Sequence, residues 1–245
     1  MRRGDAETRG RGEDSGANES SRLSIFPSPR PRVPASPRHE SASQRFRMFC
    51  AVPLTEEVRE RAARHMEFLR RQMPDVRASW DRPEKMHITL KFLGEIEVSR
   101  VEALSRAAER ASREVEAFTL SIAGAGAFPT RGLARVLWLG IEDETGSLAR
   151  LQSALETESE REGFRREERS FHPHLTIARL RKPEGARKLA RLHQDTGFEA
   201  VSFPVSELLV IRSELGPQGS RYTEISKYQL RAGEESKKVK GKRQK

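Results

Sequence analysis

Residues 171–179 have the sequence Phe-His-Pro-His-Leu-Thr-Ile-Ala-Arg, and residues 86–90 repeat its central pattern as Met-His-Ile-Thr-Leu. Alternate residues of a β-strand point to the same side, so His87 and Thr89 project together, and so do His174 and Thr176. The positions between and after them are apolar and would face the protein interior. Each stretch therefore predicts a strand with a buried face and a second face that carries an imidazole beside a hydroxyl.

The two motifs lie in elements that follow one another in the same order. The first half predicts a strand at 47–52, a helix capped by Thr55, the motif strand at 85–93 stopped by Gly94, a helix with a capping box, and a strand at 118–122. The capping box is formed by Ser99 and Glu102, and a glycine-rich bend at Gly124 and Gly126 follows the last strand.

The second half predicts a strand at 135–140, a helix closed by Gly163, the motif strand at 174–180, a helix that begins at Pro183, and a strand at 206–211. A final strand is expected at 222–228. Short strands that alternate with helices predict an α/β or α+β layered fold. Two copies related by a pseudo-twofold axis would place both His-Thr pairs across one cleft.

Composition divides the 245 residues into a body and two tails. Residues 1–45 are rich in Arg, Ser, Gly and Pro and are expected to be disordered, as is the Lys-rich segment 231–245. The net charge is +10, but residues 1–46 hold nine Lys/Arg and six Asp/Glu, and residues 231–245 hold seven and two, which leaves +2 for 47–230. The basic charge therefore says little about the partners of the body, 46–230.

Cysteine content and hydropathy indicate the compartment. Cys50 is the only cysteine, so the chain can form no internal disulfide, which suits a reducing compartment. No apolar run approaches the roughly 20 residues that a membrane helix needs. We expect a cytoplasmic monomer that has no membrane partner.

The residues of the motifs indicate phosphate chemistry. Two imidazoles that face each other can serve as base and acid in one turnover, because a histidine titrates near neutral pH. Threonine hydroxyls donate hydrogen bonds to phosphoryl oxygens. Arg179 lies at an odd spacing from His174, so a twist, a bulge or the strand end is needed to bring its guanidinium to the groove. These residues predict a metal-free phosphodiester cleaver that has no cofactor.

Other residues are weaker candidates. Phe49 is expected in the core rather than at a nucleobase, and Arg135 either reaches the cleft or is solvated. His172 and His174 could form part of a metal site, but no acidic partner lies at strand spacing. The remaining body histidines, His65 and His193, are expected at the surface, and Trp138 is expected in the core.

Together these stretches resemble a known family. The two His-x-Thr-x motifs, with Pro173 before and Arg179 after the second, are similar to the paired motifs of the 2H phosphoesterase superfamily. The resemblance narrows to the RNA 2′,3′-cyclic phosphodiesterases, first described as bacterial 2′-5′ RNA ligases. It covers roughly residues 46–230 and includes Arg47-Met-Phe, His-Ile-Thr-Leu-Lys-Phe-Leu-Gly94, Arg135-Val-Leu-Trp-Leu-Gly140 and Arg221-Tyr-Thr223.

The resemblance implies an α+β bilobal fold, with two antiparallel-sheet lobes around a central cleft and helices outside. It implies metal-independent hydrolysis of a 2′,3′-cyclic phosphate, on RNA ends or on nucleosides, to a 2′-phosphomonoester. His87 and His174 would be the acid/base pair, while Thr89, Thr176 and Arg179 would hold the phosphate. Two alternatives stay open: a 2′-5′ RNA ligase that uses the same residues, and a non-catalytic module that binds RNA ends.

Overall fold

The computed structural model describes residues 44–216 and 219–233. Most of the two expected disordered tails, 1–43 and 234–245, lies outside the described residues. Four α-helices are present in the described part: α1 (Glu56–Gln72), α2 (Val101–Glu114), α3 (Ser147–Arg161) and α4 (Ala186–Thr196). Short 3-10 turns, Pro83–Lys85 and Val98–Arg100, precede the first motif strand and α2.

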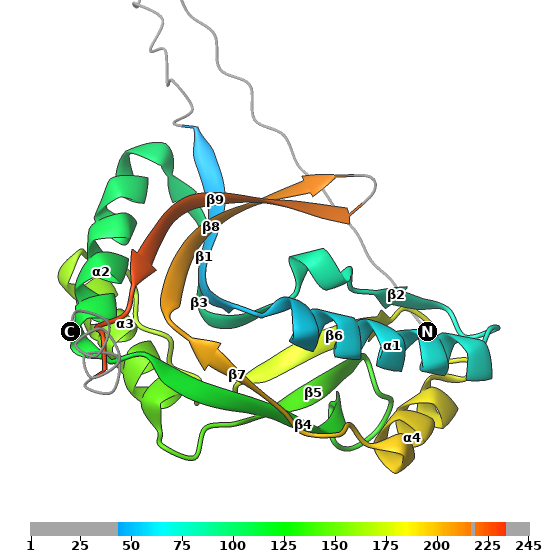
Figure 1. Cartoon of the computed structure of the whole chain (residues 1–245). Helices are drawn as coiled ribbons and strands as arrows, with labels where there is room; N and C mark the ends of the chain where they lie inside the picture. Colours follow the sequence, from blue (N-terminus) through cyan, green and yellow to red (C-terminus); the bar gives the residue numbers. More distant parts are fainter. Residues whose placement is uncertain (1–43, 217–218, 234–245) are drawn as a thin grey trace, which may run out of the picture. The chain divides into compact units, whose positions relative to one another are not determined.

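Nine strands form two antiparallel sheets in the described part (Figure 1). The first sheet has the order β3-β1-β8-β9, with β1 at Arg45–Pro53, β3 at His87–Glu97, β8 at Glu207–Gly216 and β9 at Gly219–Gln229. The second has the order β2-β6-β5-β4-β7, with β2 at Ala78–Trp80, β4 at Phe118–Phe128, β5 at Val136–Glu142, β6 at His174–Leu180 and β7 at Val201–Val205. The expected α+β fold with two antiparallel sheets is confirmed.

The expected order of strand, helix, motif strand, helix and strand is found in both halves, as β1, α1, β3, α2, β4 and as β5, α3, β6, α4, β8. Each motif strand pairs with the first strand of its own half, β3 with β1 and β6 with β5. The third strand of each half crosses to the other sheet, since β4 pairs with β5 and β8 pairs with β1. Neither half can therefore complete its sheet without the other half of the chain.

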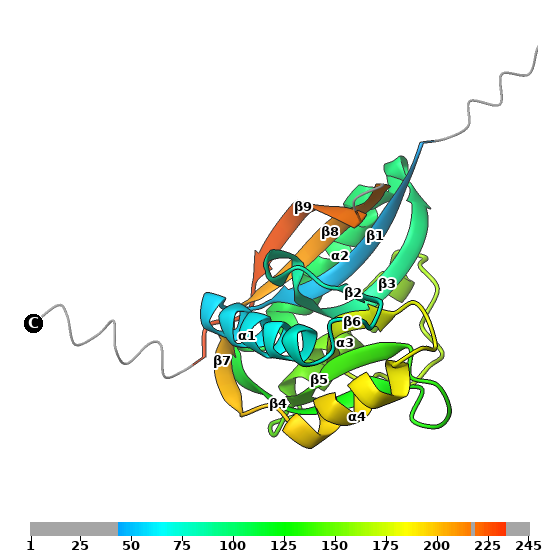
Figure 2. The same ribbon diagram turned by 90° about the vertical axis from the view of Figure 1, so that its right-hand side faces the viewer.

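The helices cover the sheets in two pairs. α2 packs against α3 and against β8 and β9, whereas α4 packs on β4 and touches α1 (Figure 1; Figure 2). The apolar stripe of α1, including Val58, Ala62 and Leu69, is buried in a core cluster shared by both sheets.

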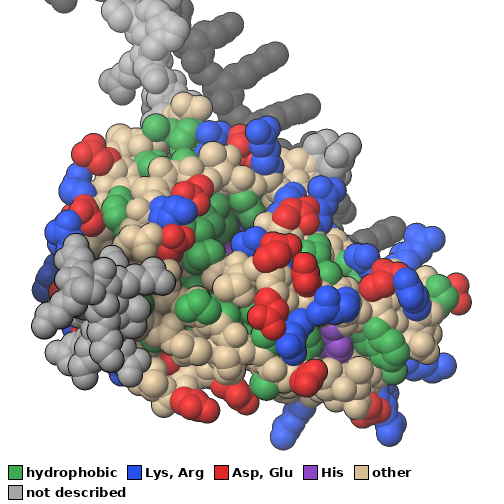
Figure 3. Space-filling view, in the orientation of Figure 1, with side chains coloured by type: hydrophobic (Ala, Val, Ile, Leu, Met, Phe, Trp, Pro, Cys, Tyr) green, Lys and Arg blue, Asp and Glu red, His purple; other side chains and the backbone are tan. Residues whose placement is uncertain are grey.

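The outer side of α1 carries charged pairs one turn apart, such as Arg61 with Glu57 and Arg71 with Glu67. Acidic and basic side chains are correspondingly interleaved on the face shown in Figure 3. Such exposed pairs stabilise a helix only slightly. This face therefore offers mixed charge to the solvent rather than a concentrated basic surface.

Two glycines that were expected to end or bend strands lie inside them. Gly94 has φ +66° and continues β3, while Gly124 has φ +73° and lies at a register shift within β4. A positive φ inside a strand is typical of a glycine bulge, which bends the strand without ending it. The expected stop at Gly94 was therefore wrong, and the bend expected at Gly124 lies inside β4 rather than after its end.

Helix starts were predicted with mixed success. Thr55 occupies the N-cap of α1 but its side chain makes no capping hydrogen bond. The capping box of Ser99 and Glu102 was wrong: a 3-10 turn leads directly into α2, Arg100 is the N-cap, and the Ser99 hydroxyl contacts Glu97.

The sequence did not predict β2 and β7; β2 has only three residues, and β7 contains Pro204, which an edge strand tolerates.

His193 is buried, not at the surface as expected. Its Nε2–H donates to the backbone oxygen of Trp138 at 3.0 Å, so its Nδ1 accepts a hydrogen bond from His65 Nε2 at 2.9 Å. Burial, with the neighbouring His193, lowers the pKa of His65 to about 4. This neutral pair ties α1 and α4 to β5.

Among the described residues no helix is both long and apolar enough to cross a bilayer. The cytoplasmic location expected from the sequence stays a prediction.

A buried ion pair joins the two motif strands indirectly. Lys91 of β3 and Glu156 of α3 form a salt bridge with side chains only 3% and 4% exposed. Lys91 Nζ also donates to the backbone oxygen of Arg165 at 2.9 Å, and Glu156 accepts the N–H of Glu167 at 3.2 Å. The segment that leads into β6 is thus fastened to β3.

We expect Lys91→Met to lower the free energy of unfolding by about 3–5 kcal/mol, because Glu156 would be left charged and without its partner in the core. The double variant Lys91→Met/Glu156→Met should regain a large part of this loss, since both charges are then removed. Chemical denaturation measures both values. A double variant no more stable than the single one would contradict the role assigned to the pair.

Candidate active site

A cavity of about 600 Å³ lies between the two sheets and is lined by both motif strands. Six of the seven candidate residues line it: His87, Thr89, His174, Thr176, Arg179 and Phe49. Arg135 is exposed and is not among the lining residues, so the structure favours the solvated alternative for it. The sequence motifs are therefore brought together, although they are far apart in the chain.

The first part of each motif strand alternates as expected. Ile88 is fully buried between His87 and Thr89, and Leu175 is 1% exposed between His174 and Thr176. The histidine and threonine of each strand face the cavity. The apolar residues thereby fix the side from which the imidazoles act.

A bulge in β6 returns Arg179 to the cavity. Thr176 pairs with Trp138 of β5, but the next pair along β5 is Leu137 with Ala178, so Ile177 is an extra residue. Ile177 and Ala178 are both fully buried, and the following side chain, Arg179, lines the cavity. This is the bulge that the odd spacing between His174 and Arg179 requires.

The same bulge occurs in β3. Thr89 pairs with Ala51 and Lys91 with Cys50, which leaves Leu90 extra and buries Leu90 and Lys91 in succession. The next residue, Phe92, lines the cavity. The fifth residue after each motif histidine therefore faces the cavity, and it is an aromatic ring in one half and a guanidinium in the other.

Both imidazoles are anchored in the same way. His87 Nδ1 lies 2.8 Å from the backbone oxygen of Lys85, and His174 Nδ1 lies 2.8 Å from that of His172. A carbonyl oxygen only accepts hydrogen bonds, so each Nδ1 carries the hydrogen and each Nε2 is left to exchange a proton. His172 thus orients its neighbour through its backbone, while its own side chain is exposed.

Aromatic rings support both imidazoles. Phe49, 3% exposed, stacks on His87 with ring centroids 4.7 Å apart, and Tyr222 meets His87 edge-on at 5.3 Å. Phe128 meets His174 edge-on at 5.2 Å. Burial is the main influence on His87 and lowers its pKa, and the hydrogen bond to Lys85 acts in the opposite direction.

Trp138 packs beside Phe128, the ring that contacts His174, rather than deep in the core. It is half-buried, and its ring centroid lies 5.1 Å from that of Phe128. A Cβ added at Gly126 would lie 2.2 Å from the Trp138 ring. Only glycine leaves room at that position for the indole.

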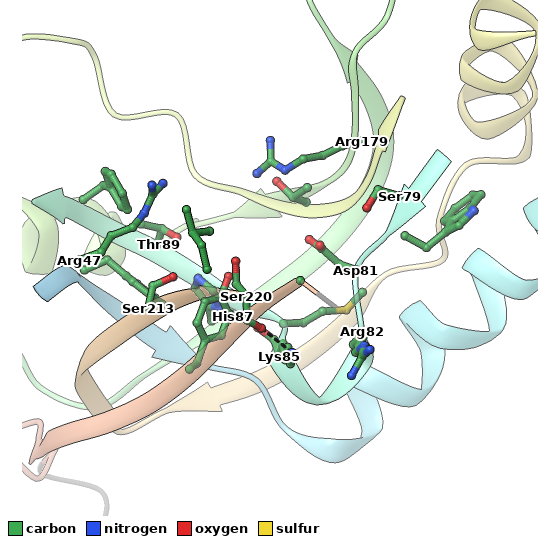
Figure 4. Close-up of a pocket in the computed structure, with 18 of the residues that line it drawn as sticks. Arg47, Ser79, Asp81, Arg82, Lys85, His87, Thr89, Arg179, Ser213 and Ser220 are labelled. Atoms are coloured by element: carbon green, nitrogen blue, oxygen red, sulfur yellow. Dashed lines mark hydrogen bonds between the residues drawn. The ribbon is translucent and has the colours of Figure 1, made fainter. Parts of the chain in front are cut away.

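Basic groups surround the motif residues. Arg47, Lys85 and Arg179 all line the cavity, and Figure 4 shows Arg179 reaching in from β6 on the side opposite His87. Lys85 Nζ also donates to the backbone oxygen of Ser220. Two or more cations converging on one cavity favour an anionic ligand.

Asp81 is the acidic residue in this basic lining. Its N–H donates to the backbone oxygen of Ile177, the bulged residue, at 2.9 Å. Burial raises the pKa of its carboxyl group, while the charges of Arg179 and Lys85 lower it. The Asp81 carboxyl group is therefore close enough to Arg179 for their charges to interact.

Sequence reasoning assigned no site role to Lys85, Asp81, Tyr222 or Phe92. Lys85 could have been found, because the expected strand begins at residue 85 and alternate residues of a strand point to the same side, which places Lys85 beside His87. Within the described residues, no three His, Cys, Asp or Glu side chains are grouped as metal ligands.

We expect Phe49→Ala to raise the pKa of His87 toward the ordinary value of about 6.5, because the ring that buries the imidazole is removed. NMR titration of the imidazole measures it. Phe46→Ala, on the same strand but stacked with Arg212 instead, should leave the His87 pKa unchanged. An unchanged pKa in Phe49→Ala would show that burial by this ring is not the cause.

The chain is similar to known proteins over a range that includes both motif strands. A family model described as the 2′-5′ RNA ligase superfamily matches residues 57–217. A protein of Methanothermobacter thermautotrophicus named RNA 2′,3′-cyclic phosphodiesterase is 36% identical over 187 residues, which cover 76% of this chain and 100% of that protein. The protein of that name from Escherichia coli K12 is 29% identical over 188 residues, covering 77% and 98%.

Solved structures agree. E. coli LigT complexed with 3′-AMP superposes with a TM-score of 0.61 at 27% identity and covers 76% of this chain and 99% of LigT. LigT complexed with phosphate gives a TM-score of 0.57 at 27% identity and covers 77% and 99%.

Proposed function

Since this chain belongs to the 2′-5′ RNA ligase superfamily, we propose that it is a hydrolase that opens 2′,3′-cyclic phosphate ends of RNA to 2′-phosphomonoesters. The observation that supports this proposal most directly is the pair of imidazoles, each anchored through Nδ1 to a backbone carbonyl two residues earlier and each lining one basic cavity. Relatives named RNA 2′,3′-cyclic phosphodiesterase, at 25–36% identity, support the same activity.

In the proposed reaction a water molecule attacks the phosphorus, and the bond from phosphorus to O3′ breaks. The Nε2 of one imidazole takes a proton from the attacking water, and the Nε2–H of the other gives a proton to O3′. One turnover therefore exchanges the protonation states of the two histidines, which solvent then restores. The product carries the phosphate on O2′ and a free 3′ hydroxyl.

The remaining lining residues would stabilise charge on the phosphoryl oxygens. The hydroxyls of Thr89 and Thr176 are hydrogen-bond donors, and Arg179 offers a planar pair of N–H groups that fits two phosphate oxygens. Lys85 and Arg47 add positive charge at the same cavity. With these donors present, the proposed reaction requires no metal ion.

We expect His87→Ala and His174→Ala each to lower kcat on a nucleoside 2′,3′-cyclic phosphate by about 10²–10⁴, in the presence of EDTA. Wild-type kcat/KM should be bell-shaped in pH, because one imidazole must be neutral while the other is protonated. Arg135→Ala is the matched control and should keep full activity, since Arg135 lies outside the cavity. Loss of wild-type activity in EDTA would refute the metal-free mechanism.

RNA ligation through 2′-5′ linkages, the activity after which the superfamily is named, is a second candidate, because it would use the same residues. Product analysis on a defined oligonucleotide with a cyclic phosphate end separates the two: hydrolysis gives a 2′-phosphate, whereas ligation gives a longer chain. A non-catalytic RNA-end module would bind this oligonucleotide without turnover.

We further propose that residues 46–230, with a few flanking residues, form the functional unit with two pseudo-symmetric lobes. Hydrogen bonds extend slightly beyond those limits, because the Gln44 oxygen accepts the Val98 N–H and the Arg231 N–H donates to the Val115 oxygen. A chain limited to residues 44–233 should keep the mononucleotide activity, and light scattering should give the mass of a monomer. Loss of activity on this truncation would assign a role to the tails.

A further inference from the structure

A second cavity, of about 410 Å³, adjoins the first. It is lined by Lys91, Phe92 and Leu93 of β3 and by the segment 164–169, which lies between α3 and β6. Phe92 lines both cavities, so the two meet at its ring. The volume falls in the range of small-ligand sites.

Phe92 is an unusual residue at this junction. Its side chain is 49% exposed although it is large and apolar. The Arg47 guanidinium carbon lies 4.7 Å from the ring centroid, and the bulge at Leu90 turns the ring into the cavity. An exposed aromatic ring among basic groups is a platform on which a nucleobase can stack.

The second cavity is lined by charged side chains of both signs, of which the arginines can bind an anion. Arg165, Arg166 and Arg169 line it together with Glu167 and Glu168. Arg166 pairs with Glu160 at 3.4 Å, whereas in the described part of the chain neither the Arg165 nor the Arg169 guanidinium forms an ion pair.

The backbone of this segment is held in place while its arginine side chains are exposed. Buried Lys91 donates to the Arg165 oxygen, and buried Glu156 accepts the Glu167 N–H. The charge of Lys91 itself is neutralised by Glu156. The arginines therefore project from a fixed support, which lowers the entropic cost of ordering them around a ligand.

We propose that this second cavity, the upstream groove (Phe92, Arg165, Arg166 and Arg169), binds the RNA nucleotide that precedes the cyclic phosphate end. The base of this nucleotide stacks on Phe92. Arg165 and Arg169 bind the phosphodiester on its 5′ side. This inference rests on the proposed function and deepens it. The preferred substrate is then an oligoribonucleotide rather than a mononucleotide.

The test compares kcat/KM on cytidine 2′,3′-cyclic phosphate and on a trinucleotide with a cyclic phosphate end. We expect Arg165→Ala/Arg169→Ala to lower kcat/KM on the trinucleotide by about 5- to 100-fold and to leave kcat/KM on the mononucleotide unchanged. The dependence of the trinucleotide activity on salt concentration should weaken by the amount expected for the loss of about one phosphate contact. Phe92→Leu should lose more on the trinucleotide than on the mononucleotide.

The matched control is Arg187→Ala/Arg191→Ala, which removes the same charge from the exposed face of α4. Three results would each overturn the proposal that this groove binds RNA. The groove variant could keep its full activity on the trinucleotide, it could lose the same activity on both substrates, or the control variant could lose as much as the groove variant. Absence of wild-type turnover on both substrates would instead refute the proposed function, so the two failures are distinguishable.

Discussion

An extra residue in each motif strand decides which side chains face the central cavity. A regular strand would direct the fifth residue after each histidine into the core, because side chains alternate with a period of two. The bulges bury two successive residues, Leu90 with Lys91 and Ile177 with Ala178, and so return Phe92 and Arg179 to the cavity. The displacement thus adds one guanidinium and one aromatic ring to the cavity lining.

The two halves share a backbone plan and differ in what they attach to it. Each imidazole gives its Nδ1 hydrogen to a carbonyl two residues earlier, and each has an aromatic neighbour. At the position after the bulge, however, one half provides a guanidinium and the other a benzyl ring. A near-symmetric scaffold thus offers a cationic group on one side of the cavity and an aromatic ring on the other.

Much of this could be predicted from the sequence where the signal is local. Period-two alternation placed His87, Thr89, His174 and Thr176 on one face each, and the repeated element order indicated the shared cleft. The pairing of β8 with β1 could not be predicted, because partners such as Ala51 and Leu209 are 158 residues apart and leave no local pattern. The burial of Lys91 was also inaccessible, since it depends on a bulge and on a partner in α3.

His193 is a different case, because its signal was present. Ala186, Leu189 and Ala190 share its helical face at spacings of seven, four and three residues, and all are buried. Its polarity suggested the surface, whereas its position on the apolar stripe predicted burial, with the hydrogen bonds to His65 and Trp138 satisfying both ring nitrogens.

The central claim is that both imidazoles present Nε2 to one phosphate. Titration of the protein with adenosine 2′-monophosphate, observed by ¹⁵N NMR of the histidine rings, tests this directly. We expect the Nε2 resonances of His87 and His174 to shift together with one dissociation constant, while both Nδ1 atoms keep their hydrogens. A shift in only one of the two rings would contradict this expectation. So would a neutral ring of either histidine that carries its hydrogen on Nε2 instead of Nδ1.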